Sequence, residues 1–166
     1  MNAKQLQYAP DSFTKQFVTL SPFSGQVVSL SHVDDPYYKS GLMGPGAAIS
    51  STSNTVVSPF AGKVLTVSPL DYAIDIQSSA GLKCKIKYGG DTSHLHGAQF
   101  ACSLKRGDEI RLKQVLFTVN AGWLKQRGVS NTCSMTLLNA NALIGVVPTH
   151  QKFVEAGEDT LLTLYL

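Results

Sequence analysis

Apolar and polar residues alternate in short runs along most of this chain, a pattern typical of half-buried β-strands. The run "LKCKIKY", residues 82–88, is the clearest case, because three lysines alternate with apolar side chains. Similar runs rich in Val, Ile, Leu and Thr are "QVVSL", "VVSPFAGKVLTV", "YAIDIQ", "EIRLKQVLFTV", "SMTLLN" and "TLLTLYL". Only "NAGWLKQRG" and "PYYKSGL" have the character of short helices. The pattern predicts an all-β fold, an antiparallel sandwich or barrel with one or two short helices.

One segment of the chain occurs twice. "SPFSGQVVSL" begins at Ser21 and "SPFAGKVLTV" at Ser58, with Ser, Pro, Phe, Gly and Val in register. A weaker pair of glycine turns, "KRGDEI" and "EAGEDT", precedes later strands. Chance similarity between hairpin entries is the alternative, but the repeat favours a fold of two related halves. We expect one domain over residues 20–166, after an extension over residues 1–19 whose first 15 or so residues are loosely held.

Composition excludes several classes of protein. The 166 residues are 43% hydrophobic and 15% charged, which suits one folded domain. The net charge of +3 is dispersed and too small to indicate a nucleic-acid-binding protein. No signal peptide and no membrane-spanning run is present, so we expect a cytoplasmic location and reduced cysteines. No nucleotide fingerprint, P-loop or nucleophile elbow occurs, and we predict no cofactor.

The order of several motifs resembles a known family. These are "SPFSGQVVSL", "GPGAAI", "VVSPFAGKV", "DYAIDIQSSAGLKCKIKYGGDT", "LHGAQF", "KRGDEI" and "AGEDTLLTLYL". Together they resemble the glucose-type enzyme IIA domain of the bacterial phosphotransferase system. The match is free of gaps from about residue 33 to 139, and with looser ends it covers residues 20–166. The resemblance implies a compact antiparallel β-sandwich of two duplicated motifs.

The resemblance also implies where a phosphoryl-transfer site lies. In that family two histidines face each other in a shallow depression. One accepts a phosphoryl group from the carrier protein HPr and passes it to a sugar-specific IIB domain, while the other supports it by hydrogen bonding. In this chain the supporting histidine falls on Tyr72 and the acceptor on Lys87, whereas Asp91 and Thr92 of the motif remain.

Neither substitution preserves the chemistry of a histidine carrier. A lysine with an ordinary pKa near 10.4 is an ammonium ion at pH 7 and has no lone pair to attack phosphorus. A tyrosine, with a pKa near 10, is a poor acceptor without help. The sequence therefore predicts a pseudo-enzyme that acts by binding protein partners, which the resemblance suggests are phosphotransferase components, a transporter or a metabolic enzyme. The alternatives are an active phosphocarrier whose acceptor has moved to His94, and a purely structural module.

A symmetric hairpin about Ser78–Gly81 would place Tyr72 opposite Lys87. That register also sets two isoleucines opposite two lysines, which is poor matching of faces, so a bulge or an asymmetric turn is the alternative. We further expect Asp91 to form an Asx-type turn and to lie close enough to Lys87 for an ion pair.

Five residues are candidates for contact with a partner protein. Lys83, Lys85 and Lys87 alternate along one strand and form either a solvent face that discourages edge pairing or a positive patch for an acidic partner. Tyr37 and Tyr38 lie where the family presents an apolar residue to its partners. Aromatic packing within the loop is the alternative for the two tyrosines.

His94 and His96 have the H-x-H spacing that places both rings on one face of a strand, as in some zinc sites. A zinc site needs a third ligand, and His32 with Asp34 or Asp35 lacks the H-x-x-x-D spacing. We therefore predict no metal site.

Overall fold

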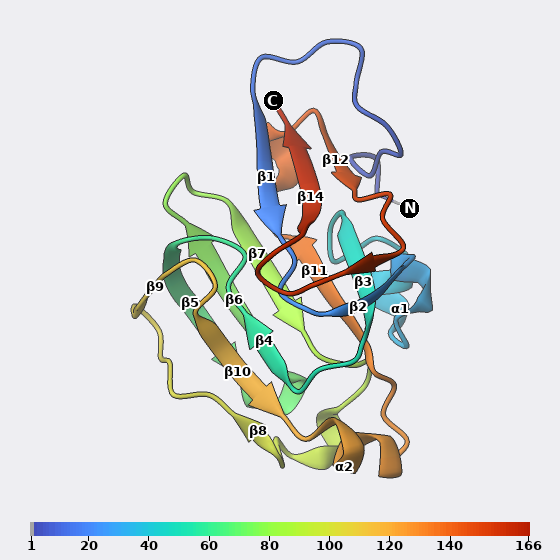
Figure 1. Cartoon of the computed structure of the whole chain (residues 1–166), viewed down its shortest axis with the longest axis vertical. Helices are drawn as coiled ribbons and strands as arrows, with labels where there is room; N and C mark the ends of the chain where they lie inside the picture. Colours follow the sequence, from blue (N-terminus) through green and yellow to red (C-terminus); the bar gives the residue numbers. More distant parts are fainter. Residues whose placement is uncertain (1) are drawn as a thin grey trace.

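Three β-sheets make up the fold of residues 2–166, which the computed structural model describes (Figure 1). The largest has the order β13 (Phe153–Val154), β2 (Gly25–Val28), β3 (Gly46–Ser51), β11 (Thr132–Leu137), β7 (Lys83–Lys87), β6 (Ala73–Ser78), β5 (Gly62–Ser68) and β9 (Glu109–Ile110). A second joins β1 (Gln16–Leu20), β14 (Thr160–Tyr165) and β12 (Gly145–Pro148), and a third joins β4 (Thr55–Val57), β10 (Val115–Val119) and β8 (Phe100–Ala101). The paired strands are antiparallel, so the predicted fold class is confirmed.

Helices are few and short. The α-helices are α1 (Pro36–Lys39) and α2 (Ala121–Gln126), and the 3-10 turns are η1 (Leu30–His32), η2 (Pro69–Asp71), η3 (Ser93–Leu95) and η4 (Ala140–Ala142). Both predicted helical segments are confirmed. Within the described residues, no helix is both long enough and apolar enough to cross a bilayer.

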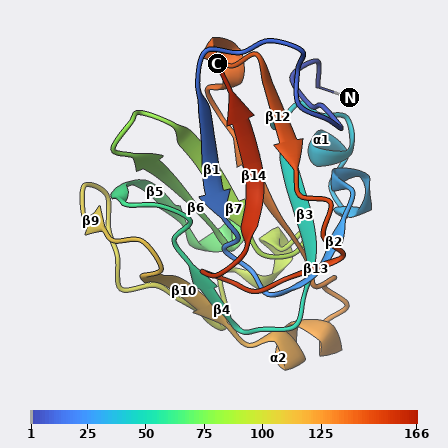
Figure 2. The same ribbon diagram turned by 45° about the horizontal axis from the view of Figure 1, so that its top comes forward.

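The apolar core lies between the sheets. Figure 2 shows β1, β14 and β12 lying side by side across the larger sheet. Buried side chains from these layers form one cluster, which includes Phe23, Ile49, Ile74, Ile86, Phe117, Met135 and Leu161. Burial of these side chains is the main force that holds the sheets together.

The sequence pattern missed strand β3, "GAAISS", because small residues have low β-propensity. Its position explains its composition. The strand runs between β2 and β11, and a Cβ added to Gly46 would lie 1.9 Å from the carbonyl oxygen of Met135. Small side chains are required here because the neighbouring backbone approaches so closely.

The internal repeat corresponds to a structural duplication. Ser21 Oγ donates a hydrogen bond to the carbonyl oxygen of Phe23 at 2.7 Å, and Ser58 Oγ donates to that of Phe60 at 2.6 Å. Strands β2 and β5 then begin at a glycine in both halves and pair with the short outer strands β13 and β9. The predicted two-half architecture is confirmed.

The second predicted pair of turns was matched wrongly. Gly157 N donates to Ser21 O at 2.8 Å, and the equivalent bond in the other half is Lys113 N to Ser58 O at 3.0 Å. Gly157 and Lys113 both have positive φ, 73° and 68°. The counterpart of Gly157 is therefore Lys113 and not Gly107, and the lysine hid this equivalence from a comparison based on glycines.

The N-terminal segment is held more firmly than expected. The Gln5 side chain accepts from Gly46 N at 2.8 Å and donates to Gly46 O at 2.9 Å, and Leu6 N donates to Val146 O at 2.9 Å. Residues 16–19, which the sequence placed in the extension, belong to β1 and pair with β14. The segment before β1 is therefore anchored to β3 and β12 by hydrogen bonds.

Candidate functional site

The hairpin between β6 and β7 sets the geometry of the candidate site. Ser78 N donates to Leu82 O at 2.8 Å, and Gly81 has a positive φ of 93°, so the loop contains three residues. Ala73, and not Tyr72, therefore pairs with Lys87. The symmetric register was wrong, and the asymmetric turn restores the matching of faces by placing isoleucine opposite isoleucine.

Burial increases along the row of lysines in β7. Lys83 is exposed, Lys85 forms an ion pair with Asp75 at 2.7 Å, and Lys87 is only 5% exposed. The expected surface of three cations is therefore not present. Lys87 cannot contact a partner protein directly, whereas Lys83 can.

The Lys87 ammonium lies between two short turns. Its Nζ donates to the carbonyl oxygen of Asp71 at 2.5 Å and to Thr92 Oγ1 at 3.4 Å. Thr92 Oγ1 in turn donates to the carbonyl oxygen of Leu70 at 3.0 Å. Because Leu70 and Asp71 belong to η2 and Thr92 precedes η3, Lys87 fastens these two turns together.

Burial lowers the pKa of Lys87 below its ordinary value, because the interior disfavours the charged form. The carboxylates of Asp71 and Asp35 oppose this shift, and the nearby Lys85 adds to it. The hydrogen bonds to Asp71 O and Thr92 Oγ1 account for two of the three ammonium protons.

Tyr72 does not face Lys87. It has a left-handed backbone conformation, with φ 50° and ψ 47°, and its buried ring packs against Phe100 with centroids 5.7 Å apart. Its hydroxyl donates to the carbonyl oxygen of Ala98. Burial raises the pKa of Tyr72, which favours the neutral phenol. Tyr72 belongs to the apolar core, whereas Lys87 shares the opposite sheet face with Ala73 and Lys85.

Asp91 forms the predicted Asx turn but does not pair with Lys87. Its Oδ1 accepts hydrogen bonds from Ser93 Oγ at 2.9 Å and from Ser93 N at 3.2 Å. These bonds lower the pKa of the Asp91 carboxyl. The Asp91 side chain is exposed, so the closest partner of Lys87 in this motif is Thr92.

His94 and His96 are exposed in a 3-10 turn rather than on a strand. His94 lies within η3, and His96 follows it with a positive φ of 55°. The strand geometry that would place both rings on one face is therefore missing. Among residues 2–166, no group of three potential metal-ligating side chains is clustered.

The two candidate tyrosines differ in exposure. Tyr37 is 62% exposed, whereas Tyr38 is 3% exposed and packs with Val33 and Ala48. Tyr38 is thus a packing residue, and only Tyr37 is free to meet a partner.

Sequence reasoning missed two groups that complete the site. The carbonyl oxygens of Leu70 and Asp71 are backbone atoms, and no residue type signals them. The Asp75–Lys85 pair was detectable, because a three-residue loop with Gly81 in the left-handed region sets these residues opposite each other.

Comparison with known protein families identifies the family to which this chain belongs. Residues 18–143 match the model of the family described as phosphoenolpyruvate-dependent sugar phosphotransferase system, EIIA 1. The chain belongs to this family. The EIIA assignment agrees with the duplicated sandwich and with the resemblance noted from the motifs.

Relatives include both multidomain and single-domain EIIA proteins. The chain is 33% identical over 145 residues to the PTS system glucoside-specific EIICBA component of Staphylococcus carnosus, covering 87% of this chain and 21% of that protein. It is 27% identical over 144 residues to the PTS system glucose-specific EIIA component of Halalkalibacterium halodurans, covering 87% and 83% respectively. The chain thus spans about a fifth of the length of the multidomain relative.

A solved structure shows the same fold. Glucose permease IIA from Mycoplasma capricolum superimposes with a TM-score of 0.78 at 24% identity, covering 90% of this chain and 96% of that one. The EIIA sandwich is therefore the fold of this chain.

Proposed function

We propose that this EIIA-family protein does not accept a phosphoryl group at the family's acceptor position and acts in the cytoplasm by binding protein partners. The observation that carries the proposal is the state of Lys87, which is buried and hydrogen-bonded through Nζ to Asp71 O and Thr92 Oγ1. Attack on phosphorus requires a lone pair and an open approach. The Lys87 Nζ is buried and held by these two hydrogen bonds, so it lacks an open approach.

The position of Tyr72 supports the same proposal. A carrier site of this family needs a second group that supports the acceptor, but the Tyr72 hydroxyl is already donated to Ala98 O within the core. Restoring a histidine at residue 87 alone would therefore leave it without the supporting group.

Phosphorylation of the purified full chain by phosphoenolpyruvate, enzyme I and HPr tests the proposal. We expect intact-mass spectrometry at neutral pH to show no added phosphate, while a competent EIIA protein in a parallel reaction becomes labelled. An acid-labile phosphate on this chain would contradict the proposal.

The second candidate function is phosphoryl transfer through His94. The observation that favours it is the exposure of His94 on η3, two residues after Thr92. If phosphate appears, His94→Ala should abolish it and the matched variant His96→Ala should retain it. The reverse result would exclude His94 as the acceptor.

Partner binding is tested separately, by pull-down from the native cell with exposed-residue variants. Phosphotransferase components, a transporter or a metabolic enzyme are the expected classes of partner. Tyr37 and Lys83 are the exposed candidates, so Tyr37→Ala and Lys83→Glu should each lose a protein that the wild type retains. Identical sets of captured proteins would favour a purely structural module.

A further inference from the structure

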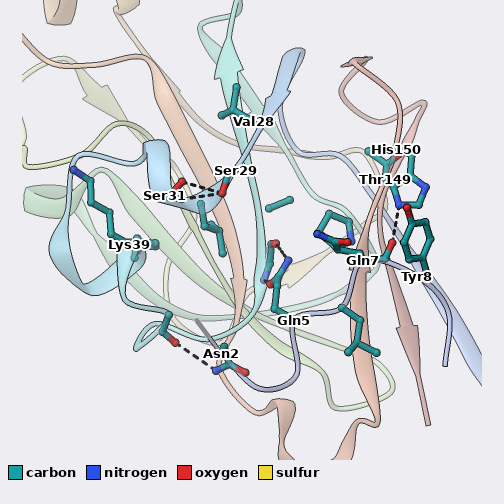
Figure 3. Close-up of a pocket in the computed structure, with 17 residues that line it drawn as sticks. Asn2, Gln5, Gln7, Tyr8, Val28, Ser29, Ser31, Lys39, Thr149 and His150 are labelled. Carbon is teal, nitrogen blue, oxygen red and sulfur yellow. Dashed lines mark hydrogen bonds between the residues drawn. The ribbon is translucent and has the colours of Figure 1, made fainter.

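A cavity of about 510 Å³ lies away from the Lys87 site, between the N-terminal segment, the connection after β2, α1 and residues 148–150 (Figure 3). Neither Tyr72, Lys87 nor Thr92 lines it. Its volume falls within the range of small-molecule sites in proteins. The cavity is therefore a candidate binding site that is separate from the position of phosphoryl transfer.

The cavity has a fixed frame. Part of its wall is formed by Tyr38 and Ala47, which are 3% and 2% exposed. Gln5 closes another part, and its amide is held at both ends by the backbone of Gly46, at 2.8 and 2.9 Å. The N-terminal segment is consequently part of the cavity wall rather than a mobile cover.

Polar groups with unused hydrogen-bonding capacity face one another across the cavity. Ser31 Oγ donates to Ser29 Oγ at 3.0 Å and keeps its own lone pairs, whereas Ser29 Oγ also accepts from Ser31 N at 3.3 Å and keeps its proton to donate. Across from them, Thr149 Oγ1 accepts from Gln151 N at 3.2 Å and still has its proton to donate. Figure 3 shows the two serines on one side, Thr149 on the other, and Gln5 between them.

An aromatic ring stands at the rim. Tyr8 is 71% exposed, yet its ring is held edge-on against His150 with centroids 5.4 Å apart. His150 Nε2 lies 2.7 Å from Gln7 O, which fixes the imidazole. In the described residues the Tyr8 hydroxyl takes part in no hydrogen bond, so the ring and its hydroxyl are available to a ligand.

The charge of the lining narrows the class of ligand. Among the described residues that line the cavity there is no Asp or Glu, and the ammonium end of their one lysine, Lys39, points away from Gln5 in Figure 3. A metal cation or an amine would find no carboxylate here. Neutral hydroxyl and amide groups with an exposed ring suit a ligand that has many hydroxyls and one apolar face.

We propose that this cavity binds a neutral polyhydroxylated small molecule of one or two sugar rings. The hydroxyls of Ser29, Ser31 and Thr149 meet the hydroxyls of the sugar, and Tyr8 stacks on the face that carries its C–H bonds. Tyr8 and the three hydroxyls thus supply the ligand contacts of a carbohydrate site that is independent of Lys87.

Titration of the isotope-labelled full chain with D-glucose and with maltose, followed by amide NMR, tests this. We expect saturable shifts of the amides of residues 5–8, 29–31 and 148–150 by at least one of the two sugars, with a Kd on the order of 1 mM. Glucose 6-phosphate should bind no more tightly than glucose, because the ammonium of Lys39 points away from Gln5. Shifts that stay linear up to 50 mM for both sugars, or tighter binding of the phosphate, would overturn the proposal.

Two variants at exposed aromatic residues form a matched pair of test and control. Tyr8→Ala should weaken binding about threefold to tenfold, the usual contribution of an aromatic contact. Phe153→Ala removes an aromatic residue that is 67% exposed but lies outside the cavity lining, and should leave Kd unchanged. Equal affinity for wild type and Tyr8→Ala would contradict the assignment. The result of the HPr phosphorylation assay does not depend on whether the cavity binds a sugar. The proposed carbohydrate site and the proposed lack of phosphorylation can therefore each be disproved without the other.

Discussion

The two halves of the sandwich share their turns and differ in the connection that follows. After β2, residues 29–45 contain η1 and α1 before β3 begins, whereas after β5 only η2 and Tyr72 precede β6. The shared turns hold the sheets, and the unlike connections provide the cavity in one half and the candidate site in the other. Duplication thus accounts for the fold, while divergence of the connections accounts for what each half can bind.

The two connections meet over Lys87. The short connection supplies Asp71 O as a hydrogen-bond acceptor for the ammonium. The long connection lies against Gly90, where an added Cβ would be 2.6 Å from Asp34 O. The Lys87 site therefore depends on both halves, although its residues lie in the second.

The largest effect is expected from the glycines that open β2 and β5. In Gly62→Ala the new Cβ would lie 1.9 Å from Gln77 O, and in Gly25→Ala it would lie 2.0 Å from Ser50 O. Both neighbours are backbone atoms within a sheet and cannot move aside cheaply. We expect each variant to lose about 3 kcal/mol of unfolding free energy or more in urea titrations.

Gly107→Ala is the matched control for this pair. Gly107 has a positive φ of 90°, but nothing lies within 4 Å of an added Cβ. It should therefore lose only about 1 kcal/mol, the conformational cost alone. A loss in Gly62→Ala no greater than in Gly107→Ala would show that the strand approach is less tight than described.

A smaller and more even effect is expected from the two turn serines. Ser21→Ala and Ser58→Ala each remove a hydrogen bond to a carbonyl two residues later, from a hydroxyl of a fully buried residue. Each should cost about 1–2 kcal/mol. Ser21 Oγ also accepts from Phe23 N at 3.3 Å, so its variant should be slightly the less stable.

If the duplicated turns are energetically equivalent, the two serine variants should lose similar amounts of unfolding free energy. If one variant loses more than twice the unfolding free energy of the other, the turns are not energetically equivalent. Ser103→Ala, at an exposed serine whose hydroxyl makes no hydrogen bond within the described residues, provides a reference near zero.

Most of the fold followed from the sequence because it depends on local patterns. Alternating runs marked β5, β6, β7, β10 and β14, and the serine–proline repeat identified the two halves. Strands without β-branched runs, such as β3, were not predicted, because the close approach of neighbouring strands requires small residues there. The equivalence of Gly157 and Lys113 also escaped, since it is a similarity of backbone conformation and not of residue type.

The candidate site was predicted less well than the fold. The sequence singled out Lys87, Tyr72 and Thr92, but an error of one residue in the hairpin register placed Tyr72 on the wrong face. The partners of the Lys87 ammonium are a backbone carbonyl and a threonine hydroxyl, and only tertiary structure brings them together. The cavity near Tyr8 was missed because it needs segments from both ends of the chain.

A modest loss is expected when the short connection loses the hydrogen bond from the Tyr72 hydroxyl. Tyr72→Phe keeps the packing against Phe100 but removes the hydroxyl that donates to Ala98 O. We expect a loss of about 1 kcal/mol in urea unfolding. Tyr37→Phe, in the long connection, removes a hydroxyl from a residue that is 62% exposed and should change stability by less than about 0.5 kcal/mol. Similar losses in both variants would remove the contrast between the connections.

The smallest effect at neutral pH is expected for Lys87→Met, and its pH dependence is the informative quantity. The lost hydrogen bonds are offset by relief of the buried charge, so we expect the unfolding free energy at pH 7 to lie within about 1 kcal/mol of wild type. The folded-state pKa of Lys87 is lowered below its ordinary value of 10.5. At pH values between the two, the unfolded chain therefore binds more protons than the folded chain, and stability rises with pH. Wild type should therefore gain stability relative to Lys87→Met between pH 7 and about pH 10.

Taking the difference between the two proteins cancels the contribution of the tyrosines, whose titration is common to both. Lys83→Met, at an exposed lysine of the same strand, should show no such trend. A difference between wild type and Lys87→Met that stays constant or falls with pH would contradict this expectation. It would mean that the surroundings of Lys87 stabilise its ammonium form, so that the two connections form a site for a cation.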